Sequence, residues 1–155
     1  MEACCEDVSV RISIREIQIA DAAPAARLSA ELGYPTSVDE IARRIQTVRA
    51  LADHAVYVAC LPEGAVAGWI DVGMIYHLQS EPYAEIGGLV VSAAARSQGI
   101  GRQLVQRAEQ WTSERGVRKV LVRSEISRER AHQFYLRDGY QRTKTSAVFS
   151  KILTD

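Results

Sequence analysis

The spacing of apolar residues changes several times along the chain and predicts where the first elements begin and end. Over residues 8–14 every second residue is apolar, which is the period of a half-buried strand. A stretch with helical spacing follows, which Asp21 can cap and which Gly33 ends. A second helical stretch begins at Ser37, where Glu40 three residues later completes a capping-box pattern. The chain therefore opens with a strand and two helices.

Apolar runs and amphipathic segments alternate over the remainder of the chain. Two runs separated by Glu63 and Gly64 predict a β-hairpin, and a third run predicts a further strand. The complete predicted order is β-α-α-β-β-β-α-β-α-β-β. The expected ranges are 55–61, 66–76 and 83–91 for these strands, 99–115 for a helix, 117–124 for a strand, 128–138 for a helix and 141–153 for a closing hairpin. Because a helix joins the strands at 83–91 and 117–124, the sheet should contain a parallel crossover.

Length and composition restrict the class of protein. The chain has 155 residues, of which 47% are hydrophobic and 25% charged. These values fit one globular domain over residues 1–155, with residues 1–8 as a flexible terminus, and exclude a disordered chain or a collagen-like fibre. No apolar run approaches the roughly 20 residues that span a bilayer, and the start lacks the layout of a signal peptide. Since Cys4, Cys5 and Cys60 lack metal-ligand spacing, we expect a cytoplasmic protein without a metal.

Charge is balanced overall but unevenly distributed. Lys plus Arg and Asp plus Glu each number 19, and the formal net charge of zero argues against a nucleic-acid binder. Twelve basic and five acidic residues lie between Arg96 and Lys144, so this stretch carries an excess of seven positive charges. The remainder of the chain carries the matching negative excess. The basic part suits an anionic ligand and the acidic part a cationic one, although scattered solvated charge would give the same count.

A glycine-containing turn between the strand at 83–91 and the following helix carries the most informative pattern. The first amides of a helix have no partner within it and lie at the positive end of its dipole, so they can bind phosphate. Gly99 and Gly101 allow the main chain to approach such a group. The P-loop pattern is absent, and the dinucleotide pattern fails because Leu104 occupies its third glycine position. An ordinary helix that begins at a glycine is the alternative interpretation.

Two motifs give the chain a resemblance to a known family. Residues 96–101 fit [QR]-x-x-G-x-[GA], and residues 131–140 fit A-x-x-F-Y-x-x-x-G-[FY]. Together with the element order, they resemble the GNAT superfamily of N-acetyltransferases, of the bacterial single-domain type, from about Val10 to Leu153. The resemblance implies an α/β (α+β) fold, with a mixed, mostly antiparallel twisted sheet whose central strands splay and about four flanking helices. It also implies direct transfer of acetyl from acetyl-CoA, as co-substrate, to a primary amine in a ternary complex.

The resemblance further implies which residues bind acetyl-CoA. The strand at 83–91 would pair its backbone with the pantetheine arm, and the turn after it would hold the pyrophosphate through main-chain amides and arginine charge. The implied cofactor-binding residues are Leu89, Val90, Val91, Arg96, Ser97, Gln98, Gly99, Gly101, Arg102, Arg128 and Tyr135. Arg128 stands where many relatives have an asparagine that contacts the cofactor, so that contact is not implied here.

Three residues are candidates for catalysis. The Leu89 amide would stabilise the oxyanion of the tetrahedral intermediate. Tyr135 would protonate the departing thiolate, with a role as a core aromatic as the alternative. Glu85 matches the spacing of the glutamate base in the histone-acetyltransferase branch, although a solvent-facing strand glutamate is an equal alternative. Weaker alternatives for the base are Asp71, Tyr76 and His77.

The acceptor pocket of the family is lined by the first two helices and the central strands. The corresponding residues are acidic or aromatic, and the substrate candidates are Tyr34, Asp71, Tyr76 and Glu85. They predict a small cationic amine and no nucleic acid or membrane partner. Residues 148–151 resemble those of aminoglycoside 6′-N-acetyltransferases, but the acidic residue that those enzymes carry near the position of Gly88 is missing.

Other functions remain open at this point. A non-catalytic acyl-CoA-binding or regulatory module, and an enzyme that acetylates a protein amine, are the alternatives. Edges of the terminal strands offer a route to a homodimer, but the sequence leaves the oligomeric state open.

Overall fold

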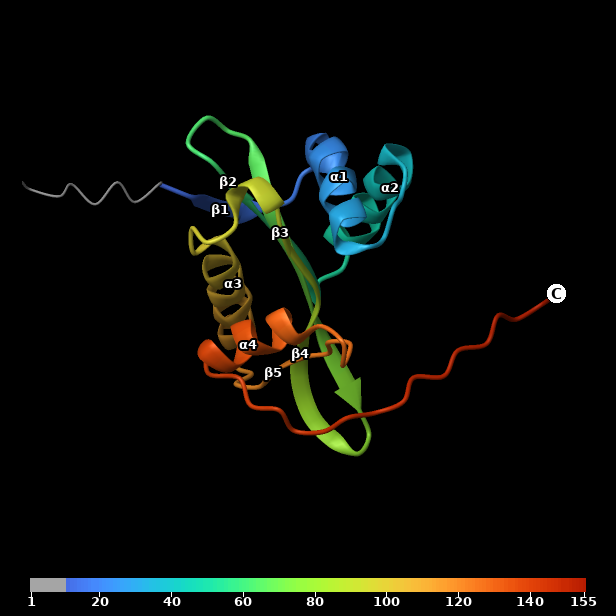
Figure 1. Cartoon of the computed structure of the whole chain (residues 1–155). Helices are drawn as coiled ribbons and strands as arrows, with labels where there is room; N and C mark the ends of the chain where they lie inside the picture. Colours follow the sequence, from blue (N-terminus) through green and yellow to red (C-terminus); the bar gives the residue numbers. More distant parts are fainter. Residues whose placement is uncertain (1–10) are drawn as a thin grey trace, which may run out of the picture. The chain divides into compact units, whose positions relative to one another are not determined.

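A computed structural model describes residues 11–155 and divides the chain into two compact units, one up to Arg123 and one over Ser124–Asp155 (Figure 1). The expectations for residues 1–8, and for Cys4 and Cys5, lie outside the described residues. Within the described part, no helix is long and apolar enough to cross a membrane.

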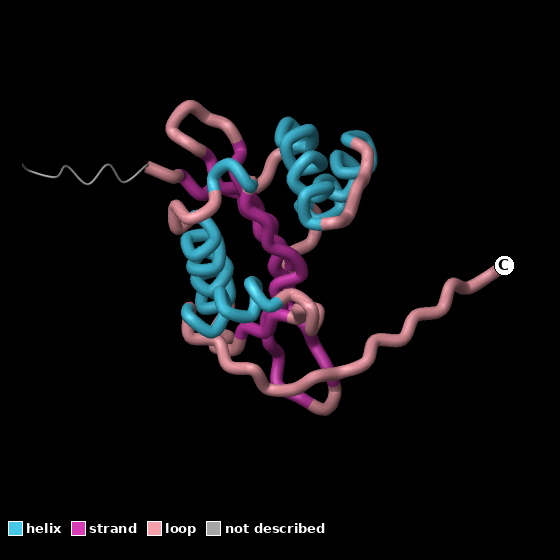
Figure 2. Tube along the Cα trace, in the orientation of Figure 1, coloured by secondary structure: helices cyan, strands magenta, loops and turns pink. Residues whose placement is uncertain are grey.

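The first unit is built on a five-stranded sheet in the order β1-β2-β3-β4-β5. Its strands are β1 (Ser13–Glu16), β2 (His54–Cys60), β3 (Val66–His77), β4 (Ser80–Val91) and β5 (Val120–Val122). All neighbours pair antiparallel except β4 and β5, which pair parallel, so the predicted crossover is confirmed. The hairpin of β3 and β4 is the longest pairing (Figure 2).

Local capping signals fix the helices close to their predicted bounds. The helices are α1 (Ala22–Leu32), α2 (Val38–Arg49), α3 (Ile100–Glu114) and, in the second unit, α4 (Glu129–Arg137). Two short 3₁₀ turns, η1 (Ile19–Asp21) and η2 (Ala93–Ala95), precede α1 and α3. Ser37 and Glu40 form the predicted capping box, and Gly33 ends α1 at a φ of 102°. Asp21 does not cap α1 through its side chain, because its carboxylate binds Arg15 and the Gln18 amide instead.

Helices cover both faces of the sheet in the first unit, α1 and α2 on one side and α3 on the other (Figure 1). On the first face, Ala25 and Ile45 pack with Val56 in one buried cluster. Trp69 packs against this cluster, so the odd-numbered residues of the central part of β3 share this face. A Cβ placed at Gly68 would lie 3.2 Å from the Leu104 side chain, so the even-numbered positions face α3.

The second unit consists of α4 and the segment after it. Gly139, at a φ of 90°, ends the helix, and the Tyr140 amide donates to the Tyr135 carbonyl at 3.0 Å. From Gln141 to Asp155 the chain has no helix or strand, and its side chains are exposed (Figure 2). The prediction of a closing hairpin over 141–153 is therefore wrong. This stretch contains no Gly, Asn or Asp before Asp155, so it lacks the residues that adopt the positive φ of a two-residue hairpin turn.

Candidate active site

A β-bulge interrupts the pairing of β3 and β4 in the middle of the sheet. Asp71 lies opposite Gly88, but Val72 lies opposite Ile86, so Gly87 is an extra residue on β4. A Cβ at Gly87 would lie 2.9 Å from Asp71 Oδ1, and one at Gly88 would lie 2.9 Å from the Trp69 ring. A side chain at Gly88 would displace the Trp69 ring, and one at Gly87 would displace the Asp71 carboxylate, so both side chains lie close over bare main chain.

Beyond this bulge, β4 is paired on one side. In the described chain β5 pairs only with residues 84–86 of β4, so residues 87–91 have β3 as their one neighbouring strand. The Ser92 amide donates to the Ala67 carbonyl at 2.7 Å, which makes these two residues a hydrogen-bonded pair. Because such pairs alternate along an antiparallel ladder, the amides of Leu89 and Val91 point away from β3. These amides are available to an extended ligand, as predicted for the pantetheine arm.

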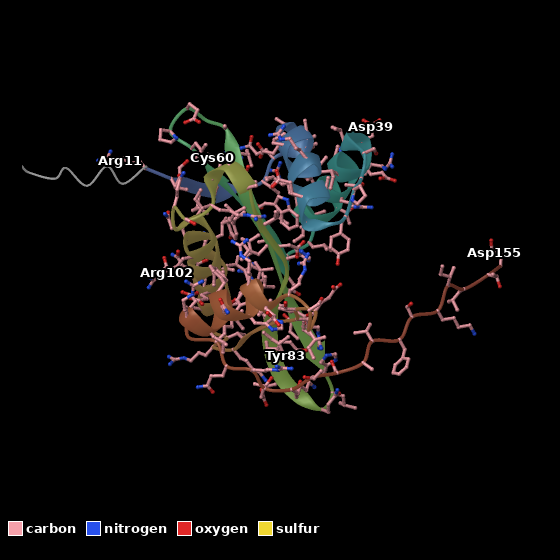
Figure 3. All side chains as sticks on the ribbon, viewed as in Figure 1. Arg11, Asp39, Cys60, Tyr83, Arg102 and Asp155 are labelled. Carbon is pink, nitrogen blue, oxygen red and sulfur yellow. The ribbon has the colours of Figure 1, made fainter. Side chains whose placement is uncertain are left out.

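The turn between β4 and α3 has the geometry of an anion-binding loop. Residues 96–99 are exposed, and two of them have positive φ, 68° at Ser97 and 75° at Gly99. Ser97 is the only non-glycine residue of the described chain with this conformation, which costs about 1–3 kcal/mol and is typical of functional loops. Gly99 begins α3 without a side-chain cap, so the helix presents its first amides to a ligand. Figure 3 shows Arg102 on the first turn of α3.

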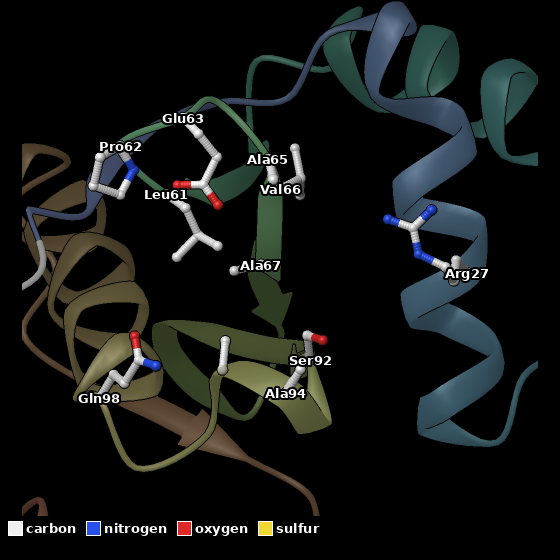
Figure 4. A pocket seen from close by; sticks show the side chains of 11 residues that line it. Arg27, Leu61, Pro62, Glu63, Ala65, Val66, Ala67, Ser92, Ala94 and Gln98 are labelled. Carbon is white, nitrogen blue, oxygen red and sulfur yellow. The ribbon is translucent and has the colours of Figure 1, made fainter.

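One cavity borders this turn, and none of residues 87–91 of the open half of β4 lines it. It has a volume of about 410 Å³ and lies between the β2–β3 connection, α1 and η2 (Figure 4). Gln98 is the one residue of the anion-binding loop that lines it, together with Arg27 of α1. No sequence pattern predicts this cavity, because it forms where three segments that are far apart in the chain meet.

A smaller cavity of about 120 Å³ lies between α1, α2 and the sheet. Its lining is mostly apolar, and its polar residues are Ser29, Arg44, Trp69 and Asp71. Trp69 Nε1 is buried without a hydrogen-bond partner among the described residues. The cavity therefore reaches from the helices to the bulge, where the family places its acceptor.

Glu85 and Asp71 lie on the same face of the sheet as Trp69. Glu85 lies opposite Gly73 on β3, and its carboxylate accepts a hydrogen bond from Arg123 Nε at 3.1 Å. Asp71 pairs instead with His54, whose Nε2 lies 2.8 Å from Asp71 Oδ1. His54 escaped the sequence analysis because a single histidine at the start of a strand carries no motif.

The two candidate tyrosines of the acceptor site lie elsewhere in the first unit. Tyr34 follows Gly33 at the end of α1, and its side chain is largely exposed. Tyr76 lies near the β3–β4 turn, roughly 16 Å along the strand from Asp71, and is exposed as well. The structure thus brings Asp71 and Glu85 to one face beside the bulge. Tyr34 and Tyr76 do not join them there, since Tyr34 lies at the end of α1 and Tyr76 near the β3–β4 turn.

Tyr135 and Arg128 belong to the second unit. Tyr135 contacts the rings of Phe134 and Tyr140, with ring centroids 5.1 Å and 5.5 Å away. Burial raises the pKa of Tyr135 to about 12, and the charge of Arg128 partly opposes this rise. The phenol is therefore protonated at neutral pH. Arg128 precedes the first residue of α4.

Comparison with known proteins identifies the class to which this fold and site belong. Residues 20–140 match the family described as "Acetyltransferase (GNAT) family". The chain belongs to this family and is an N-acetyltransferase that uses acetyl-CoA as co-substrate. The predicted family, fold class and co-substrate are confirmed.

Individual relatives narrow the comparison further. The chain is 28% identical to an aminoglycoside N(6′)-acetyltransferase type 1 of Stenotrophomonas maltophilia, over 88% of this chain and 91% of the relative. It is 34% identical to an aminoalkylphosphonate N-acetyltransferase of Salmonella typhimurium, over 75% of this chain and 73% of the relative. A solved aminoglycoside N-acetyltransferase in complex with CoA has the same fold, with a TM-score of 0.83 at 17% identity over 94% of this chain and 97% of the other.

Proposed function

We propose that this enzyme transfers acetyl from acetyl-CoA to a primary amine of a small cationic molecule, within a ternary complex. The observation that carries the proposal is the position of the Leu89 amide in the open half of β4. Leu89 follows directly after Gly88, and Gly88 lies opposite Asp71 of β3. The relatives named above act, by their names, on aminoglycosides and aminoalkylphosphonates, which are small amines. Their common feature supports a small acceptor rather than a protein amine.

The described residues fit acetyl-CoA at two places in the first unit. Leu89 and Val91 offer outward amides on a strand edge, with Val90 between them, and the edge suits the amides of an extended pantetheine arm. The loop from Arg96 through Gln98, followed by Gly99, Gly101 and Arg102, offers main-chain amides and positive charge to the pyrophosphate. Arg128 would add charge from the second unit. Bound there, acetyl-CoA supplies an activated acetyl thioester.

The residues of the chain then divide the work of the transfer. The Leu89 amide donates to the carbonyl oxygen as negative charge develops on it, which lowers the barrier to attack by the amine. Tyr135 protonates the departing sulfur. A phenol with a pKa of about 12 is a weaker acid than a thiol with a pKa of about 8.5, so it donates its proton as charge develops on sulfur rather than before.

Recognition of the acceptor rests on the acidic face beside the bulge. Asp71 and Glu85 attract an ammonium group toward the Leu89 amide, and Tyr34 and Tyr76 supply aromatic surface farther out. Gly88, which replaces the acidic residue of the aminoglycoside enzymes, leaves the Trp69 ring across this position. The predicted role of Glu85 as general base stays a prediction, since Arg123 holds its carboxylate.

An acceptor screen tests this function. The enzyme is incubated with acetyl-CoA and a panel of aminoglycosides, polyamines, aminoalkylphosphonates, amino acid derivatives and lysine-containing peptides, and free thiol is measured. We expect turnover with at least one small cationic amine, and a fall in kcat/KM for that amine of about 10-fold or more in Asp71→Asn. Turnover confined to peptides, or none with any amine despite binding of CoA, would contradict the proposal.

A further inference from the structure

The residue that the sequence analysis missed, His54, is hydrogen-bonded to Asp71, which lies opposite Gly88 in the open half of β4. His54 begins β2 and lies opposite Gly73 of β3, and both His54 and Asp71 have side chains that are less than one third exposed, at 28% and 30%. Their hydrogen bond is 2.8 Å long. The pair is therefore partly shielded from water yet reachable from solvent.

Glycines on β3 and β4 leave room for the two side chains of this pair. A Cβ at Gly73 would lie 3.1 Å from His54 Nδ1, and one at Gly87 would lie 2.9 Å from Asp71 Oδ1. The imidazole thus lies over bare main chain at Gly73, which itself lies opposite Glu85 on β4. With Nε2 directed at Asp71, Nδ1 is the ring nitrogen that lies over Gly73.

Charged residues from four segments lie around the pair. Asp71 on β3 and Glu85 on β4 favour a positive charge on His54, and Arg44 on α2 and Arg123, directly after β5, oppose it. Arg44 and Asp71 are the charged residues that line the small cavity, and Asp53 precedes His54 in the chain. The hydrogen bond with Asp71 raises the pKa of His54, while its burial lowers it to a smaller extent. The raised pKa strengthens the imidazole as a base near neutral pH.

We propose that His54 is the base that removes the proton from the acceptor amine, and that Asp71 is its positioning residue. This inference rests on the proposed function. Neutral His54 donates its Nε2 proton to Asp71, which leaves the Nδ1 lone pair for the amine. The acceptor attacks as its free base, after the ammonium group has released one proton to water. As the amine nitrogen bonds to the acetyl carbon, its second proton passes to Nδ1, and Asp71 stabilises the imidazolium. The carbon–sulfur bond breaks, the sulfur takes a proton from Tyr135, and His54 and Tyr135 then exchange protons with water.

Opposite shifts in two pH profiles test this assignment, with any amine that the wild-type enzyme acetylates. His54→Gln should lower kcat/KM at neutral pH by about 100-fold or more, and should remove the acidic limb that we expect in the wild-type profile. Asp71→Asn should move that limb to lower pH, because the group that raises the pKa of His54 is gone. A purely structural role would lower the rate without moving the limb in either direction.

Controls separate loss of the base from loss of the fold. His77→Gln is a matched control, because His77 lies at the β3–β4 turn, opposite Ser80 and beside Tyr83, and its profile should equal that of wild type. Each variant should bind CoA with the wild-type dissociation constant. Added imidazole should restore part of the activity of His54→Ala, because this substitution leaves a space that the free ring can fill.

The outcomes distinguish this inference from the proposed function. An acidic limb that persists in His54→Gln and disappears in Glu85→Gln overturns the inference and makes Glu85 the base, while the proposed function stands. A limb that disappears in His77→Gln overturns it in favour of that residue. A wild-type enzyme that acetylates no amine overturns both.

Discussion

The two halves of β4 differ in the number of strands beside them. Residues 84–86 pair with β3 on one side and β5 on the other, and Ala84 and Ile86 are buried in this double pairing. Residues 87–91 pair with β3 alone, and they begin with two adjacent glycines at the bulge. One strand thus serves first as the centre of a sheet and then as an edge. The free amides and carbonyls of an edge strand can pair with a further strand. Along residues 87–91 an extended ligand can take the place of that strand.

The largest expected effect comes from adding a side chain at the bulge. Gly88→Ala places a Cβ within 2.9 Å of the Trp69 ring, so the open half of β4 must shift. We expect kcat/KM for acetyl-CoA to fall by about 100-fold or more, since a misplacement of about 1 Å at a reacting centre has this effect. Gly64→Ala is the control, because nothing lies near its Cβ and the strain of its φ of 95° is confined to the β2–β3 turn. Unchanged kinetics in Gly88→Ala would break the comparison between the two halves.

Tyr135→Phe tests the proposed role of Tyr135 as the acid that protonates the departing sulfur. We expect kcat to fall by about 100-fold with little change in the KM for acetyl-CoA. Because the pKa of Tyr135 is raised to about 12, the phenol stays protonated below about pH 11, and the wild-type kcat should show no basic limb from this group. Tyr140→Phe, which removes the hydroxyl of the neighbouring ring, serves as the control. A basic limb near pH 9 that Tyr135→Phe removes would be inconsistent with this burial.

A smaller effect is expected at the start of α3. Gly99→Ala puts a side chain at a φ of 75°, which is strained by about 1–2 kcal/mol and displaces the anion-binding loop. The KM for acetyl-CoA should rise by roughly 5-fold while kcat is kept. Gly116, after the other end of α3, has a φ of 73° and equally open surroundings, so Gly116→Ala should destabilise the fold equally and leave the KM unchanged. Equal KM values in both variants would show that the loop does not hold the pyrophosphate.

The opposite edge of the sheet should affect stability alone. Arg15 binds the buried Asp21 carboxylate through two hydrogen bonds of 2.7 Å and 2.9 Å, which hold the pKa of Asp21 below its usual value of 3.8. Arg15→Ala should lower the free energy of unfolding by about 1–2 kcal/mol near pH 7, with unchanged kcat/KM. The stabilisation is present above the unfolded pKa and is lost as the pH falls toward the folded one. The difference between wild type and variant in urea unfolding should therefore shrink below pH 4.

The elements of the fold could be predicted where their signals are local. The capping box of Ser37 and Glu40 and the stop at Gly33 involve neighbours in the chain, and both elements end where the sequence indicated. The anion-binding loop was predictable for the same reason. The closing hairpin failed because strand pairing depends on a partner and a turn, and alternating polarity after Tyr140 supplied neither.

The site itself could be predicted only in part. Glu85 and Asp71 were found by position, but the ion pair with Arg123 joins residues 38 apart, and the pair of His54 and Asp71 joins residues 17 apart. Such contacts depend on the register of three strands and on a bulge that shifts it by one residue. The paired glycines at 87 and 88 were visible in the sequence, yet their meaning needs the neighbouring strand.

Trp69 gives the open half of β4 a built-in optical reporter. The chain has two tryptophans, and their surroundings differ sharply: Trp111 is 3% exposed on α3 beneath the Arg115 guanidinium, whereas Trp69 lies across Gly88 with its ring nitrogen unpartnered among the described residues. A molecule that enters beside the bulge changes the polarity around one indole and leaves the other as an internal reference. Emission from the unlabelled enzyme can therefore report the arrival of the acceptor separately from any chemistry that follows.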